Sequence, residues 1–73
     1  MEKIHTGRFV TVNSSGQVEL RLINVGIICK FGFNATYAVI SGNTIQVNTK
    51  DGKLEYYKLS HDGYSVTGPY LGV

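Results

Sequence analysis

The chain has 73 residues, of which 42% are hydrophobic and 16% charged, and its net charge is +2. That length fits one small domain over residues 1–73, whose thin core leaves little volume for a buried active site. The seven basic residues are spread along the chain, which does not favour a polyanion-binding protein, and the single cysteine excludes an internal disulfide.

Targeting and membrane segments are not expected. Residues Met1–His5 lead into a polar–apolar alternation without the apolar run of a signal peptide. The longest apolar stretch, Val25–Cys29, is far too short to cross a bilayer. Because a lone cysteine fits a reducing compartment, we expect a soluble cytoplasmic protein that has no membrane partner.

Short runs rich in Val, Ile, Thr, Tyr and Phe, separated by glycines, predict β-strands along the whole chain. No window repeats apolar residues at helical spacing, so no helix is expected. Side chains alternate between the two faces of a strand, so Val18 and Leu20 should face one way and Glu19 and Arg21 the other. The predicted strands of the first half are Lys3–Val12, Gln17–Val25, Ile27–Phe33 and Thr36–Ser41.

Three hairpin turns in the second half predict a four-stranded meander. Pairs of Gly, Asn and Asp supply the positive φ that tight hairpin turns need. A two-residue first turn would pair Ile40 with Ile45 and Ala38 with Val47. The turn pairs are Gly42-Asn43, Asp51-Gly52 and Asp62-Gly63.

The second of these turns allows two registers. A two-residue turn would place Tyr57 and Leu59 on the face opposite to Ile45, and would set Lys50 against Lys53. A three-residue loop with a bulge would instead place Tyr57 and Leu59 on the same face as Ile45. We favour the bulged loop, because it avoids the like-charge pair.

The complete pattern predicts an all-β fold. We expect a small antiparallel meander of about six to seven short strands that forms a barrel or a compact sandwich. Residues 68–73 contain the only proline and are expected to form a tail outside the hydrogen-bonded ladder.

Tyrosines are the candidate partner-binding residues. Five tyrosines in so short a chain is a high density, and tyrosine is enriched at protein interfaces. Several strands are also apolar on both faces, which is more apolar surface than one thin core can hide. The leading hypothesis is a non-catalytic protein-binding module, an adaptor, inhibitor or small structural subunit, whose partner is another protein or a second copy. The candidate residues are Tyr56, Tyr57, Tyr64 and Tyr70.

The alternative hypothesis is a small β-barrel that binds single-stranded nucleic acid. Lys30-Phe31-Gly32-Phe33 combines a cation with aromatic rings, on which bases stack with about 1–3 kcal/mol each. These four residues resemble the first RNA-binding motif of cold-shock domains. They lack the glycine expected between the lysine and the first aromatic, and no second aromatic motif follows at the right distance. The competing interpretation places Phe31 and Phe33 in the core. The candidate residues are Lys30, Phe31, Phe33, Arg8 and Lys58.

No catalytic residue, metal site or cofactor is predicted, and an enzyme is the least favoured class. Cys29 lies within an apolar alternation and is interpreted as a buried, inert thiol. His61-Asp62 is interpreted as part of a hairpin turn. Cys29, His5 and His61 do not have the close spacing of zinc ligands.

Overall fold

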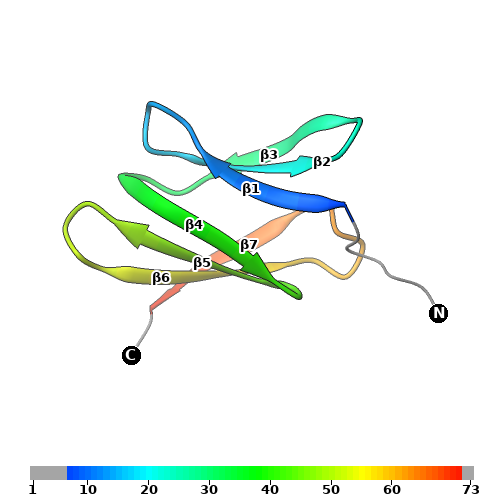
Figure 1. The fold of residues 1–73 in the computed structure, drawn as a ribbon. Helices are drawn as coiled ribbons and strands as arrows, with labels where there is room; N and C mark the ends of the chain where they lie inside the picture. Colours follow the sequence, from blue (N-terminus) through cyan, green and yellow to red (C-terminus); the bar gives the residue numbers. More distant parts are fainter. Residues whose placement is uncertain (1–6, 72–73) are drawn as a thin grey trace.

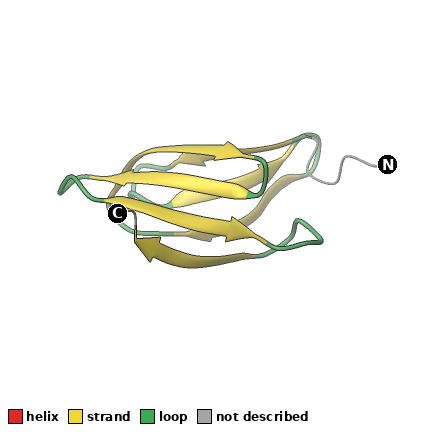
Figure 2. Cartoon of the chain, turned by 90° about the horizontal axis from the view of Figure 1, so that it is seen from below, coloured by secondary structure: helices red, strands yellow, loops and turns green. Residues whose placement is uncertain are grey.

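The computed structural model describes residues 7–71 of the chain. Within that range every regular element is a β-strand, and short loops connect the strands (Figure 2). The all-β prediction is therefore confirmed, whereas residues 3–6 of the first predicted strand lie outside the described residues. The strands are β1 (Arg8–Val12), β2 (Val18–Leu22), β3 (Gly26–Phe31), β4 (Ala35–Ser41), β5 (Thr44–Thr49), β6 (Leu54–Leu59) and β7 (Val66–Leu71).

The strands form two antiparallel meander sheets that pack as a compact sandwich. One sheet has the order β1-β2-β3 and the other β4-β5-β6-β7. Figure 1 shows the three-stranded sheet above the four-stranded one, with β1 and β4 side by side at the front. Of the two predicted architectures the sandwich is the one observed, because each sheet keeps its own two edges instead of joining into a closed barrel.

The β4–β5 hairpin has the predicted register. Ile40 pairs with Ile45, and Ala38 pairs with Val47. Gly42 adopts a φ of 61°, in the left-handed region that glycine enters without strain. The turn residues therefore fix which side chains of this hairpin face the core.

The β5–β6 connection is the bulged loop. The amide of Thr49 donates to the carbonyl of Lys53 at 3.0 Å, which closes a three-residue loop. Gly52 at its end has a φ of 84°. Tyr57 consequently pairs with Ile45, and both side chains are buried. The favoured register of the meander is thus confirmed.

The predicted strand Gln17–Val25 is too long. Strand β2 ends at Leu22, whose carbonyl accepts a hydrogen bond from the amide of Val25 at 3.0 Å. Asn24 provides the reversal with a φ of 67°, a conformation that asparagine tolerates better than most residues. Ile23 and Val25 are therefore turn residues, 57% and 70% exposed.

The prediction of a tail at residues 68–73 is wrong for the part that the structure describes. Strand β7 runs to Leu71, and Tyr70 pairs with Tyr56 of β6. Pro69 is tolerated because β7 is an edge strand, where a missing N–H need not break a ladder on both sides. Residues 72 and 73 lie outside the described range.

The core fills the space between the two sheets. Its fully buried side chains come from β2 and β5: Val18, Leu20, Ile45 and Val47. Phe31 of β3 and Tyr57 of β6 complete it, with ring centroids 4.5 Å apart and the planes tilted by 54°. This aromatic pair joins β3 to β6 across the core.

Phe31 and Phe33 form a matched pair for testing the core. We expect Phe31→Ala to lower the free energy of unfolding by about 3 kcal/mol, because it removes a ring that packs on Tyr57. Phe33 is 78% exposed, so we expect Phe33→Ala to change stability by less than about 0.5 kcal/mol. Urea unfolding followed by circular dichroism measures both. Equal effects of the two substitutions would contradict this core.

Candidate binding surface

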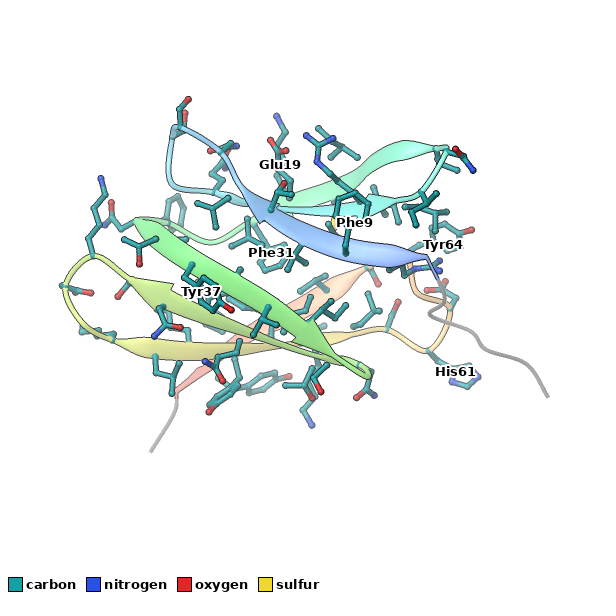
Figure 3. All side chains as sticks on the ribbon, in the orientation of Figure 1. Phe9, Glu19, Phe31, Tyr37, His61 and Tyr64 are labelled. Atoms are coloured by element: carbon teal, nitrogen blue, oxygen red, sulfur yellow. The ribbon has the colours of Figure 1, made fainter. Side chains whose placement is uncertain are left out.

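The outer side of sheet β4–β7 gathers most of the exposed aromatic side chains of that sheet. In its central row Val39 pairs with Gln46, Gln46 with Tyr56, and Tyr56 with Tyr70. Tyr37 lies two residues before Val39 on the same side of β4, and Figure 3 shows its ring on the front of the molecule. We call this surface the tyrosine face and define it as Tyr37, Val39, Tyr56 and Tyr70.

The tyrosine face is exposed, and uncharged polar groups lie beside its rings. Tyr37 is 58% exposed and Tyr70 49% exposed. The amide of Gln46 donates to Asn48 Oδ1 at 3.4 Å, and the hydroxyls of Tyr70 and Thr67 lie 3.4 Å apart. Large amphipathic rings with amide and hydroxyl neighbours can exclude water while they offer hydrogen bonds, as interface centres do.

Two of the predicted partner-binding residues, Tyr56 and Tyr70, belong to the tyrosine face. Tyr57 does not, and its assignment to a binding surface is corrected. Its side chain is only 5% exposed and contacts Phe31. Burial raises the pKa of the Tyr57 hydroxyl, and the nearby carboxylate of Glu55 raises it further. The register of β6 turns Tyr57 inward and leaves Tyr56 outside, as adjacent residues of a strand require.

Tyr64 lies away from the tyrosine face, in the turn between β6 and β7. It is 57% exposed, and the guanidinium carbon of Arg8 lies 5.0 Å from the centre of its ring. Arg8 Nε also donates to the carbonyl of Gly63 at 2.8 Å. These two interactions of Arg8 therefore hold the start of β1 against the β6–β7 turn. Figure 3 shows Tyr64 at this end of the sandwich.

The five residues of the nucleic-acid hypothesis do not share one surface. Lys30 is on the outer side of sheet β1–β3, opposite Glu19, and Lys58 is on the outer side of the other sheet, opposite Thr44. Phe31 packs inward, and Phe33 follows the end of β3. Arg8 interacts with Gly63 and Tyr64 at the end of the sandwich.

The side chains considered for chemistry are also dispersed. Cys29 is half-buried, and burial raises the pKa of its thiol. Asp62 accepts hydrogen bonds from the hydroxyl of Ser60 at 2.5 Å and from the amide of Tyr64 at 3.1 Å, so it organises the turn as predicted. His61 points outward at the tip of that turn (Figure 3). Between residues 7 and 71, no three His, Cys, Asp or Glu side chains gather as metal ligands would, and His5 lies outside the described residues.

The candidate partner-binding residues predicted from the sequence did not include Tyr37 and Val39. The signal was present, because the confirmed register pairs Ile40 with Ile45 in the core and so places Val39 and Tyr37 on the other side of β4. A bulge between Ala35 and Tyr37 does not alter this outward placement of Tyr37. Counting residues from the β4–β5 turn was therefore sufficient to place Tyr37 and Val39, two of the four residues of the tyrosine face, on the outer side of the sheet.

A polar cluster covers the outer side of sheet β1–β3. Glu19 is only 6% exposed there, because Asn13 Nδ2 donates to it at 3.0 Å and Arg21 donates at 2.6 Å. Arg21 Nε also donates to Thr11 Oγ1 at 3.2 Å. The side-chain oxygen of Asn13 accepts from the amides of residues 15 and 17, so the cluster fixes the β1–β2 turn to the sheet.

Comparison with known proteins gives no relative: no family model matches the chain, and neither a curated protein nor a solved structure shows significant similarity to it. Among residues 7–71 there is also no helix that has the length and apolar character to span a membrane.

The polar cluster predicts a pH dependence of stability. The hydrogen bond from Asn13, and then that from Arg21, lower the pKa of Glu19 below its usual 4.5. Its stabilising contribution is therefore complete above about pH 4.5 and is lost as pH falls through the lower pKa of the folded state. We expect the melting temperature of Glu19→Gln to fall less than that of wild type between about pH 6 and pH 3. Asp51 and Asp62, whose pKa values are also lowered, remain in both proteins. An equal fall of the melting temperature in wild type and Glu19→Gln would contradict the assignment of this pH dependence to Glu19.

Proposed function

We propose that this chain is a non-catalytic protein-binding module and that the tyrosine face is its contact surface. The observation that carries the proposal is the row of paired residues from Val39 to Tyr70, which crosses all four strands of one sheet. With Tyr37 beside it, the row places three tyrosine rings and one branched side chain on the same side of a hydrogen-bonded sheet.

The composition of the tyrosine face fits a protein partner. Tyrosine supplies a large contact area while losing little side-chain entropy, and the sheet beneath already holds the rings in position. Lys58, from the neighbouring row of β6, is a cation at the rim. Charges at a rim mainly affect association rate and partner choice, whereas central aromatic groups supply most of the affinity.

The partner is either a different protein or a second copy of this chain. A module of this size acts by covering a surface on a larger assembly, as an adaptor, an inhibitor or a small structural subunit. A symmetric pair of tyrosine faces would form an isologous dimer, in which the same patch serves both copies. Sedimentation equilibrium separates the two cases, because only self-association depends on the concentration of this chain alone.

The double variant Tyr37→Ser/Tyr70→Ser tests the proposal. Both rings are exposed, so we expect the melting temperature to stay close to that of wild type. If the rings are central contacts, their loss should weaken binding by at least about 30-fold. The measurement compares tagged wild-type and variant protein by quantitative mass spectrometry of captured proteins, by titration of the recovered partner, and by sedimentation equilibrium.

Tyr64→Ser is the matched control. It removes the same kind of ring, at similar exposure, from a turn outside the tyrosine face. The proposal requires that Tyr64→Ser keeps the captured partner or the dimer while the double variant loses it. A wild-type protein that remains monomeric and captures nothing above the level of the double variant would contradict the proposal.

A further inference from the structure

A second row of paired residues lies next to the tyrosine face, on the outer side of sheet β4–β7. Lys58 follows Tyr56 by two residues on β6, so their side chains share this side of the sheet. The two rows are about 7 Å apart along the strands. We call the second row the lysine row; it crosses all four strands and consists of Ser41, Thr44, Lys58 and Thr67, each paired with the next.

Lys58 is the only charged residue on that outer side within the described part of the chain. Its side chain is exposed, and among residues 7–71 its ammonium group forms no salt bridge. Glu55, on the same strand, pairs with buried Val47 and therefore faces the inner side. The outer side of sheet β4–β7 thus presents one cation that no carboxylate of the same surface neutralises.

We propose that the tyrosine face and the lysine row together bind an extended acidic segment of a different protein, with a carboxylate on Lys58 and an apolar side chain on Tyr56. The inference rests on the function proposed above and names the chemistry of the partner. A carboxylate beside the ammonium group would form a charge-assisted hydrogen bond. The uncharged hydroxyls of Thr44 and Thr67, on either side of Lys58, place no second charge next to this pair.

The carboxylates of the chain itself argue against a second copy as the occupant. A symmetric pair of tyrosine faces would bring Lys58 of both copies into an interface without a carboxylate from residues 7–71. Of the five acidic residues only Glu2 lies outside that range, and each of the others already has an intramolecular partner. Hydrogen bonds reach Glu19 from Asn13 and Arg21, Asp51 from Thr49, Glu55 from the hydroxyl of Tyr57, and Asp62 from Ser60 and the amide of Tyr64.

The spacing of the rows predicts the pattern of the segment. Along the strands the lysine row is followed by the row of Tyr56, and then by a row in which Tyr37 and Leu54 both pair with Asn48. Successive rows are two residues apart, and side chains of an extended segment also return to the same side every second residue. A segment that lies along β6 therefore carries an acidic residue followed by two apolar residues at alternate positions.

A synthetic peptide with this pattern tests the inference. The probe is a short capped peptide in which one glutamate and then two leucines alternate with serines, and the matched control has glutamine in place of the glutamate. Titrated to about 5 mM into ¹⁵N-labelled full-length protein, the glutamate peptide should shift the amide resonances of Tyr56, Lys58 and Thr67. It should leave the amide of Lys30, on the outer side of the other sheet, unchanged. Unchanged amides of β6 and β7 at the highest concentration would overturn the inference.

The contribution of Lys58 has a separate readout. Wild type should bind the glutamate peptide about two- to fivefold more tightly than the glutamine peptide, as expected for an exposed charge pair. Lys58→Gln should remove this preference, whereas Lys50→Gln, which changes an exposed lysine of the β5–β6 loop, should keep it. Both variants should melt close to wild type, because both side chains are exposed. Equal affinity of wild type for the two peptides, or a preference that persists in Lys58→Gln, would overturn the inference.

Titration of the partner recovered by capture separates this inference from the proposed function. Lys58→Glu keeps the rings and reverses the charge, so it should weaken binding by at least about fivefold, whereas Lys50→Glu should not. A partner that is lost in Tyr37→Ser/Tyr70→Ser but binds Lys58→Glu as tightly as wild type would overturn the acidic segment and leave the proposed function standing. A dimer of this chain that requires the same rings would likewise overturn only the choice of a different protein.

Discussion

The contact between Phe31 and Tyr57 is the interaction on which the rest of this structure depends. It joins the last strand of one sheet to the third strand of the other, with ring centroids 4.5 Å apart, and so sets the alignment of the two sheets. The contact requires a specific register on each side. Phe31 faces Tyr57 because β3 pairs Phe31 with buried Val18, and Tyr57 faces inward because the three-residue loop after β5 pairs it with Ile45. A one-residue slip in the pairing of either strand would turn its ring to the outer side of the sheet.

The register that turns Tyr57 inward also places Tyr56 on the outer side of its sheet. The outer side of sheet β4–β7 carries the tyrosine face on strands that are paired by hydrogen bonds with their neighbours in the sheet. A partner that binds there would contact side chains.

The sequence predicted those features that depend on local chemistry. Gly42 and Gly52 marked their turns, and counting residues from each turn placed Ile45, Val47 and Tyr57 on one side of the meander. The failures came from tertiary context. Asn24 ended β2 earlier than its apolar neighbours suggested, and the position of β7 at a sheet edge allowed Pro69 within a strand. Glu19 was placed on the correct side, but its burial arises from a turn residue, Asn13, that folds back over the sheet. Which strands of the two sheets lie over one another has no sequence signal, so the dispersal of Lys30 and Lys58 over opposite outer sides could not be predicted.

The alignment of the two sheets can be measured directly by nuclear Overhauser spectroscopy of the free protein in solution. The structure predicts cross-peaks between the ring protons of Phe31 and Tyr57. It predicts none between the backbone Hα and amide protons of β3 and those of β7, since these strands belong to different sheets and share no ladder. Cross-peaks between the Hα protons of one of these strands and the amide protons of the other would show that the sheet closes into a barrel. That result would contradict both the two-sheet sandwich and the open edge of β3.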